Sequence, residues 1–349
     1  MLARGVEIVE ITLYTEPSIL TAHRKDWHDL VRNSISNELF LTCLWQATWW
    51  QVYHPGALWV LVVRDDDGRW MGVAPWFVQT VEGRRVVRTI GCVDVTDYLD
   101  IIVRRGAEDA VYNALLGWLA KHSIDYDEVC LCNIPQNSPT LARVPALAPE
   151  HGLRAETGIE DVCPVLRLPR RFEDYLAALD KKKRHELRRK LRRAAGVADW
   201  YIVEPDKHDL EAELSRFLDL MAASSPEKAA FLAVPENRMF FRRIVPLMAE
   251  HGWLQLAFLT VEGEAVAAYL NFTYRHRVLV YNSGIRPGTH DYLSPGIVLL
   301  GWLIRYAIEQ DYTEFDFLRG NEPYKYDLGG RDTYVYRLSI APDENGTRT

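Results

Sequence analysis

The sequence predicts an α/β fold built from two similar halves, each with a mixed sheet flanked by helices. Strand-like and helix-like segments alternate along its 349 residues, and this length suits two domains of about 150 residues each. Two segments, 57–78 and 254–274, read as β-hairpins because each places a glycine turn between two apolar runs. The turn glycines Gly68 and Gly263 lie at equivalent places in a matched order of elements, which favours an internal duplication.

The first half is expected to begin with a strand at 6–12 and a helix at 17–33. A proline and a serine at the start of the second segment indicate the beginning of the helix. The elements expected after these are a Trp-rich helix at 42–53, the hairpin 57–78, strands at 84–91 and 98–103, a helix at 107–122 and a strand at 127–134. Two prolines shortly before residue 170 mark a boundary. The predicted domains are therefore 1–165 and 166–349.

The second half is expected to open with a strongly basic helix at 171–195. Its block 181–193 holds nine Lys and Arg against one Glu, in a chain whose formal net charge is −7. One basic segment on an acidic body argues against DNA binding and for a local contact with an anion. The thin apolar stripe of this helix consists of Leu176, Leu179, Leu187 and Leu191. The helix is either a solvated surface element or a binding site for a phosphate-bearing ligand such as RNA, coenzyme A or a nucleotide sugar. Its candidate phosphate-binding side chains are Arg184, Arg188, Arg189 and Arg192.

Five cysteines, at positions 43, 92, 130, 132 and 163, form no C-x-x-C pair. An odd number without a framework favours free thiols in a reducing compartment, with Cys130 and Cys132 as small buried hydrophobes on one face of a strand. Acidic residues interrupt the apolar N-terminal run, so a signal peptide is not expected. No run approaches the roughly 18 apolar residues of a membrane span. We therefore expect a cytoplasmic protein, and no metal-ligand spacing predicts a metal site.

A polar loop before an apolar helix is the first candidate site. Ser294 is expected to cap this helix, with Pro295 at its first position and Gly296 next. Unpaired backbone N–H groups and the helix dipole at such an N-terminus bind phosphate well. An ordinary capped helix explains the same residues.

The segment 315–330 is the second candidate site, because ionisable residues crowd the end of a strand expected at 313–318. Asp316 lies between two phenylalanines and must either pair with a cation or have a raised pKa. Arg319 or Lys325 would be the partner. In an α/β sheet ligands collect at the carboxyl ends of strands, so a ligand site is one interpretation and a structural ion-pair network is the other.

These segments resemble the GNAT superfamily of N-acyltransferases, and more closely its BioF2-like (CelD-type) branch. The second half carries the resemblance in KKKRHELRRKLRR, NSGIRPGTHDYLSPGIVLL and FDFLRGNEPYK. The first half carries it in FLTCLWQATWW, GVAPW and GCVDVTDYLDIIV. The branch is also similar to the Fem-type transferases, which move amino acids from aminoacyl-tRNA onto cell-wall precursors.

The resemblance implies a tandem GNAT-like acyl-CoA N-acyltransferase fold, with acyl-CoA (acetyl-CoA) as co-substrate and an amine as acceptor. Its donor site would lie in the second half. The donor-binding residues would be Tyr281, Asn282, Arg286, Ser294, Pro295 and Gly296. The family's usual phosphate loop is Arg/Gln-x-x-Gly-x-Gly/Ala, whereas here Arg286, Gly288 and Gly296 depart from that spacing. This departure leaves room for another phosphorylated donor.

The implied chemistry needs a base, a proton donor and a group that stabilises the oxyanion. Asp316 or Glu322 would take the proton from the attacking ammonium. Tyr324 or Tyr281 would protonate the leaving thiolate, and a backbone N–H in the strand after 278 would stabilise the oxyanion. The side chains expected to orient a carboxylate or phosphate of the acceptor are Arg319 and Lys325.

Two clusters in the first half allow two interpretations each. Asp97 and Tyr98, with Asp94 and Asp100 beside them, either bind a cationic acceptor or form a solvated turn. Trp45 and Trp49 share a helix face and either pack in the core or form a stacking platform.

The sequence therefore predicts an N-acyltransferase that acts on a small-molecule amine or on a cell-envelope or polysaccharide precursor. One alternative is an aminoacyl-tRNA-dependent transferase, which would make tRNA a partner. Another is a catalytically degenerate protein that binds a ligand without turnover. If the polar segment is catalytic, alanine at Asp316 or Lys325 should abolish transfer and shift the melting temperature by only a few degrees.

Overall fold

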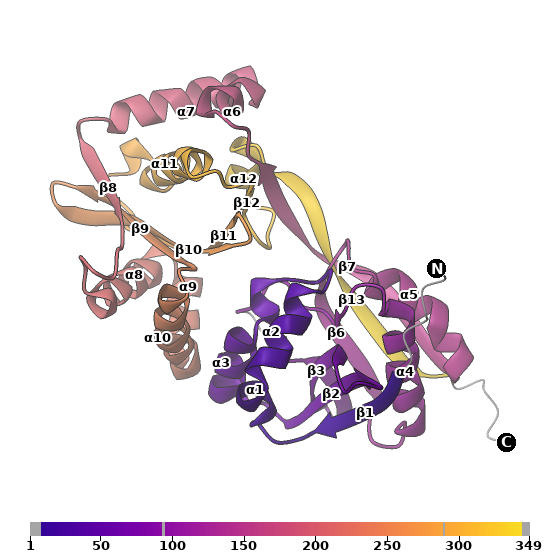
Figure 1. Ribbon diagram of the computed structural model, residues 1–349. Coiled ribbons are helices and arrows are strands. Elements are labelled where there is room, and N and C mark those ends of the chain that lie inside the picture. The colour runs from indigo at the N-terminus through magenta and orange to yellow at the C-terminus, as the bar shows by residue number, and fades with distance from the viewer. Residues whose placement is uncertain (1–7, 93–94, 289, 344–349) are drawn as a thin grey trace. The chain divides into compact units, whose positions relative to one another are not determined.

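The computed structural model describes residues 8–92, 95–288 and 290–343 of the chain (Figure 1). The chain forms two compact units: unit 1 comprises 1–161 and 334–349, and unit 2 comprises 162–333. The predicted boundary between duplicated halves, at 165/166, stays a prediction.

Unit 1 is built on an antiparallel sheet with one parallel pair. Its strands are β1 (Ile8–Tyr14), β2 (Ala57–Asp65), β3 (Trp70–Val81), β4 (Arg84–Thr89), β5 (Ile102–Val103) and β6 (Glu128–Pro135). The order is β1-β2-β3-β4-β6, with β5 beside β3, and β4 and β6 are the parallel pair. The β2–β3 hairpin turns at Gly68, whose φ of 76° favours glycine. This hairpin lies where the sequence predicts it.

The helices of unit 1 bury the aromatic residues of the first half. They are α1 (Ile19–Ala22), α2 (Arg24–Arg32), α3 (Cys43–Tyr53), α4 (Glu108–Lys121) and α5 (Thr140–Leu147). One helix was expected at 17–33, but it breaks at His23, which has non-helical backbone angles. Trp45 and Trp49 are fully buried, and the indole of Trp45 donates to the hydroxyl of Thr96 at 3.1 Å. Core packing is thus the role of this Trp pair.

Unit 2 contains a four-stranded antiparallel meander followed by a short parallel strand. Its strands are β8 (Ala198–Ile202), β9 (Leu254–Val261), β10 (Glu264–Tyr274), β11 (Arg277–Ile285) and β12 (Glu314–Asp316). The order is β8-β9-β10-β11-β12. The predicted second hairpin is formed by β9 and β10, with Gly263 at a φ of 83° in its turn.

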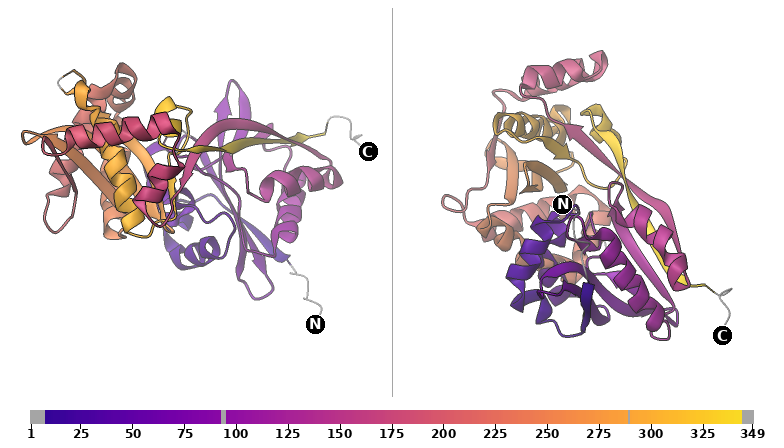
Figure 2. Two further views of the ribbon diagram at one scale, coloured as in Figure 1. Left: turned by 90° about the horizontal axis from the view of Figure 1, so that it is seen from above. Right: turned by 45° about the vertical axis from the view of Figure 1, so that its right-hand side comes forward.

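Helices cover both faces of this sheet (Figures 1 and 2). On one side lie α8 (Leu210–Ser224), α9 (Pro226–Ala233) and α10 (Pro235–Glu250). On the other side lie α6 (Phe172–Ala178), α7 (Lys181–Ala194) and α11 (Pro295–Glu309), and α12 (Pro323–Asp327) follows β12. A core of buried side chains from α7, α11 and the strands fills that second side. No helix in the described part of the chain is long and apolar enough to cross a membrane.

The single basic helix expected at 171–195 is two helices. The chain is extended at Leu179 and Asp180, between α6 and α7, and Leu179 is buried. The thin leucine stripe packs as its spacing predicts, because Leu187 and Leu191 lie against Gly301 of α11. A side chain at Gly301 would meet Leu191 at 3.0 Å, so a small residue permits this helix contact.

Two long strands, β7 (Leu153–Arg167) and β13 (Arg331–Pro342), each run from one unit into the other. β13 pairs with β6, and β7 pairs with β12. The complete strand order is β1-β2-β3-β4-β6-β13-β7-β12-β11-β10-β9-β8. The expectation of two separate mixed sheets is therefore wrong, because these two strands join the ladders into one mixed sheet. The α/β class and the flanking helices are as predicted.

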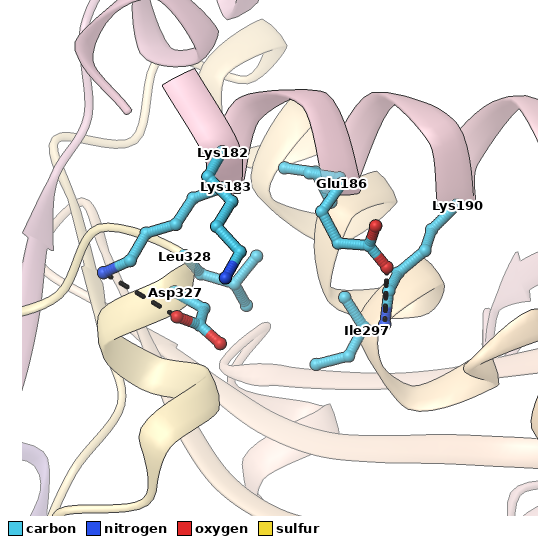
Figure 3. Close-up of a pocket in the computed structure, with 8 residues that line it drawn as sticks. Lys182, Lys183, Glu186, Lys190, Ile297, Asp327 and Leu328 are labelled. Carbon is cyan, nitrogen blue, oxygen red and sulfur yellow. Dashed lines mark ion pairs between the residues drawn. The ribbon is translucent and has the colours of Figure 1, made fainter. Parts of the chain in front are cut away.

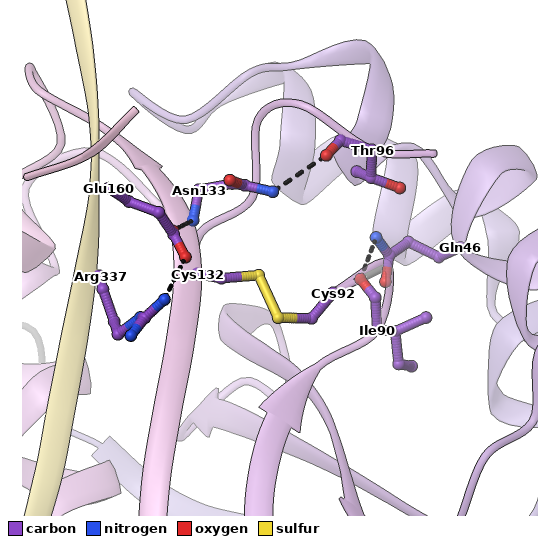
Figure 4. The surroundings of a disulfide bond; sticks show 8 residues. All are labelled: Gln46, Ile90, Cys92, Thr96, Cys132, Asn133, Glu160 and Arg337. Atoms are coloured by element: carbon purple, nitrogen blue, oxygen red, sulfur yellow. Dashed lines mark hydrogen bonds and ion pairs between the residues drawn. A yellow bond between two sulfur atoms is a disulfide. The ribbon is translucent and has the colours of Figure 1, made fainter. Parts of the chain in front are cut away.

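The expectation that all cysteines are free is also wrong. A disulfide joins Cys92 to Cys132 across 40 residues of sequence, with 6.2 Å between the Cα atoms (Figure 4). This separation lies in the usual range for a disulfide. Cys92 follows β4 and Cys132 lies on β6, so the parallel pairing of these strands brings the two residues together. Cys43, Cys130 and Cys163 are free thiols.

Candidate active site

The strands β11 and β12 separate soon after they meet. Their parallel pairing covers only Arg277–Leu279 with Glu314–Asp316, whereas β11 continues along β10 as far as Ile285. A register shift between β10 and β11 leaves Tyr281 without an opposite residue, which is a β-bulge. Where two parallel strands separate, their backbone N–H and C=O groups no longer pair with each other and can bind a ligand. This part of β11 is where the sequence predicts an oxyanion-stabilising N–H.

Asp316 ends β12 and holds the turn that follows it. Its side chain is 1% exposed, and its Oδ1 accepts the backbone N–H of Leu318 at 2.9 Å. Leu318 has a φ of 55°, a left-handed conformation that costs a branched side chain free energy. The carboxylate therefore stabilises a strained turn at the carboxyl end of the strand.

Lys325 fastens the same turn from the other side. It is 2% exposed, and its Nζ donates to the carbonyl oxygens of Leu318 at 3.2 Å, Arg319 at 2.6 Å and Gly320 at 3.0 Å. The carboxylate of Glu322 lies 2.9 Å away. An ammonium has three hydrogens, so the turn itself uses the donors of Lys325. Orienting an acceptor would require it to exchange one of these bonds.

Two phenols, buried Tyr269 and half-buried Tyr324, lie near Glu322. Burial first, and then the charge of Glu322, raise the pKa of Tyr324 above its ordinary value. The pKa of Tyr269 is raised by burial and by the charges of Tyr324 and Glu322. Both phenols therefore stay protonated at physiological pH and are available as proton donors. The sequence predicted Tyr324, but it gave no signal for Tyr269, which reads as a β10 core residue.

Lys228 is a further ionisable residue that sequence reasoning missed. Located in the first turn of α9, it donates from Nζ to the carbonyl oxygen of Ser283 at 2.5 Å and to the hydroxyl of Ser283 at 3.0 Å. Burial lowers its pKa to about 8, and the charge of Glu322 opposes this shift. Nothing in the local sequence distinguishes Lys228 from a surface lysine, because its burial arises only when α9 packs beside β11.

The residues expected to bind the donor occupy different surroundings. Tyr281 packs its ring against Phe241 of α10 and Phe272 of β10, with ring centroids 6.0 and 5.0 Å away. Asn282 lies opposite Leu270 of β10, next to the bulge. The guanidinium of Arg286 pairs with Glu264 at 3.7 Å and is 46% exposed.

At the N-terminus of α11, Ser294 occupies the cap position without capping through its side chain. Its backbone is left-handed, with a φ of 54°, and its hydroxyl accepts from Lys190 of α7 at 2.9 Å. The expected side-chain cap is therefore wrong, because the hydroxyl serves a basic side chain instead. Pro295 begins the helix as predicted. A Cβ at Gly296 would lie 2.6 Å from the side chain of Ile285, so this glycine brings α11 close to the end of β11.

A cavity of about 280 Å³ lies beneath α7 (Figure 3). Its lining residues are Lys182, Lys183, Glu186, Leu187, Lys190, Ile297, Asp327 and Leu328. Two of its lysines have acidic partners: Lys183 lies 3.7 Å from Asp327, and Lys190 lies 3.7 Å from Glu186. The cavity has an apolar floor and a largely neutralised polar rim. In the described part of the chain no three His, Cys, Asp or Glu side chains are grouped to hold a metal ion.

The polar residues predicted in the first half lie within unit 1. Asp97 is 9% exposed and Tyr98 is 6% exposed, so the interpretation as a solvated turn is wrong, while Asp94 lies outside the described residues. The carboxylate of Asp100 accepts from the hydroxyls of Ser36 and Thr140 and from the N–H of Ile101. Burial raises the pKa of Asp100, and these hydrogen bonds oppose that shift. The strand expected at 98–103 shortens to two residues because its beginning forms this network.

Residues 181–326 match the family model described as an acetyltransferase (GNAT) domain, which confirms the resemblance for this segment of the second half. The fold is similar to the crystal structure of FemX, with a TM-score of 0.66 and 12% identity over 94% of this chain and 97% of that one. It is similar to L-PGS from Bacillus licheniformis, with a TM-score of 0.54 and 15% identity over 97% and 95% of the two chains. It is also similar to a conserved protein of unknown function from Bacteroides thetaiotaomicron, with a TM-score of 0.57 and 14% identity over 95% of this chain and 100% of that one. Similarity at these identities extends to the fold. No curated protein matches the sequence significantly.

Proposed function

Because residues 181–326 carry a GNAT acetyltransferase domain, we propose that the protein is an N-acyltransferase. It moves an acyl group from acyl-CoA to an amine on a small molecule or on a cell-envelope or polysaccharide precursor. The observation that carries this proposal is the early separation of β11 from β12, with the polar segment 316–325 following β12.

In this proposal the acyl carbonyl of the donor lies against the freed part of β11. A backbone N–H there stabilises the negative charge that forms on the carbonyl oxygen during attack. Tyr324 gives its proton to the leaving sulfur; burial and the charge of Glu322 raise its pKa and so keep the phenol protonated before transfer. Tyr269 lies near Tyr324 and is the second protonated phenol of the proposed site.

Lys325, Glu322 and Asp316 act in this proposal chiefly by shaping the turn at 317–322. Their hydrogen bonds and ion pair fix this turn, and it leads directly into Tyr324. The phosphates of the donor would bind near the N-terminus of α11, where Lys190 reaches the hydroxyl of Ser294. Arg319, Asp97 and Tyr98 remain candidates for binding the acceptor.

Aminoacyl-tRNA is the second candidate donor, and the basic face of α7 favours it. Lys181, Lys182, Arg188 and Arg192 are exposed, and none of them has an ion-pair partner among the residues that the structure describes. Uncompensated basic side chains along one helix suit a nucleic-acid backbone. An affinity for tRNA that falls steeply with salt, and that Arg188→Gln and Arg192→Gln reduce together, would support this donor.

The proposal is tested by incubating the protein with acetyl-CoA, longer acyl-CoAs and a panel of amines, and by measuring acylated products by mass spectrometry. A thermal-shift measurement with the same donors separates binding from turnover. A donor at about 100 times its dissociation constant stabilises the fold by roughly 2.7 kcal/mol. Tyr324→Phe should bind the donor normally and lose roughly 10²-fold in kcat, with Tyr312→Phe as a matched control, since Tyr312 precedes β12.

Two outcomes would overturn the acyl-CoA proposal, and a third would overturn only the role of Tyr324. A response to tRNA without a response to any CoA thioester would favour the aminoacyl donor. Binding of acyl-CoA without any acylated product would favour a protein that binds its ligand without turnover. Full activity of Tyr324→Phe would remove the assigned proton donor.

A further inference from the structure

The side chain of Lys228 is anchored beside the part of β11 that has left β12. Its Nζ contacts both oxygens of Ser283, and Ser283 lies four residues beyond Leu279, where the pairing with β12 ends. Lys228 is half-buried. Buried lysines are rare unless they are paired, and the partner of Lys228 here is Ser283.

The anchoring leaves one position of this nitrogen available. Two hydrogens of the amine serve Ser283, and within the described residues no other hydrogen-bond partner contacts Nζ. A neutral amine also has two hydrogens and keeps both bonds, and its third position is then a lone pair. Lys228 can therefore take up and release a proton without losing its anchor.

The electrostatic surroundings suit such proton exchange. Burial lowers the pKa of the Lys228 amine to about 8, so a useful fraction is neutral slightly above neutral pH. Among the described residues, Glu322 is the charged group that acts on it, and Glu322 raises its pKa. A base whose pKa lies near the working pH is the most effective one.

The two carboxylates expected to act as the base are already engaged. Asp316 accepts the N–H of Leu318 and is 1% exposed. The carboxylate of Glu322 lies 2.9 Å from the ammonium of Lys325, with which it forms an ion pair. The amine of Lys228, by contrast, contacts this part of β11 directly and keeps one position outside the hydrogen bonds that the described residues make with it.

We infer that Lys228 is the general base that deprotonates the acceptor ammonium, an inference that rests on the proposed function. The neutral amine takes one proton from the acceptor, whose nitrogen then forms a bond to the acyl carbon. The bond from that carbon to the leaving sulfur or oxygen breaks, and Tyr324 gives its proton to the leaving atom. The surplus proton on the new amide nitrogen restores the phenol, and Lys228 releases its own proton to solvent.

The test compares kcat and KM across pH for the wild type, Lys228→Arg and Lys228→Met. Arginine keeps the charge and the hydrogen-bond donors but cannot act as a base, since its pKa exceeds about 12. We expect both variants to lose roughly 10²–10⁴-fold in kcat with little change in KM. The wild-type rate should rise with pH up to about 8, the pKa of the Lys228 amine. This rising limb of the pH–rate profile should be absent in both variants. Methylamine added to Lys228→Ala should restore part of the rate.

Lys207→Met is the matched control, because Lys207 is 62% exposed and pairs with Glu204. Its rate and pH profile should equal those of the wild type. A Lys228→Arg enzyme that keeps the wild-type rate and the same pH limb overturns the role of Lys228 and leaves the proposed function standing. A wild-type protein that acylates no amine overturns both. If Lys228→Met does not fold, Lys228→Arg decides the question alone.

Discussion

The ammonium of Lys325 lies 2.9 Å from the carboxylate of Glu322 and at the same time donates to three consecutive backbone carbonyls. A group so completely engaged and 2% exposed belongs to the framework of the site. The sequence alone predicts that its loss would leave stability almost unchanged. The contacts of Lys325 predict the opposite, a clear loss of stability.

Replacing Lys325 by methionine should lower the free energy of unfolding by about 2–4 kcal/mol, because buried carbonyl oxygens lose their donor. Urea denaturation of the variant measures this loss, with Lys207→Met as the exposed-lysine control. A melting temperature within a few degrees of the wild type would instead return Lys325 to a role in binding substrate.

Gly284→Ala should destabilise unit 2. A Cβ at this position would lie 2.6 Å from the backbone nitrogen of Met221 and 2.7 Å from the carbonyl carbon of Leu220. Backbone atoms cannot move aside cheaply, so we expect a loss of about 2–3 kcal/mol. Gly158→Ala is the control, because a Cβ at Gly158 meets nothing within 4 Å. Equal stability of the two variants in urea would contradict this account.

Lys228 should make stability depend on pH in one direction. Its native pKa of about 8 lies below its ordinary value of 10.5, so between these values the unfolded chain holds more protons there. The free energy of unfolding should therefore rise with pH in this window, by at most about 1.4 kcal/mol per pH unit. Below pH 8 both states are protonated and this gain is absent.

Urea denaturation of the wild type and of Lys228→Met near both ends of that window checks the sign. Tyrosines with raised pKa values contribute the opposite slope, but they are common to both proteins and cancel in the difference. A difference between the two proteins that stays constant with pH would contradict a lowered pKa at Lys228.

The disulfide between Cys92 and Cys132 should be detectable directly. Alkylation of the denatured, unreduced protein should label Cys43, Cys130 and Cys163, and mass spectrometry should find the other two in one linked peptide. Replacing both bridged cysteines by serine should cost about 4 kcal/mol for a loop of this length, whereas Cys130→Ser should cost little. Five labelled cysteines would contradict the bridge.

The sequence predicts those features that depend on local pattern. The two glycine-turn hairpins, the helices at 43–53 and 108–121 and the leucine stripe of α7 lie where periodicity and turn residues place them. The ends of elements are less predictable: β5 and β12 are short because Asp100 and Asp316 draw their backbones into turns.

The parts of the site that depend on tertiary packing could not be predicted. Tyr269 and Lys228 look like a core residue and a surface residue, and they approach Glu322 only when β10 and α9 pack in unit 2. The disulfide likewise requires the parallel pairing of β4 with β6. Conversely, Lys325 stands out in the sequence, but its framework role follows from the three carbonyls around it.

The path of β13 has a consequence for biosynthesis. This strand pairs with β6 of unit 1, yet the ribosome makes it only after all of unit 2. While unit 2 emerges, the edge of β6 has no partner and presents unpaired N–H and C=O groups. Unit 2 can thus complete its own fold during translation. Unit 1, although it is synthesised first, completes its sheet only when β13 has been made. A chain halted after residue 333 would leave that edge exposed and prone to association with other chains.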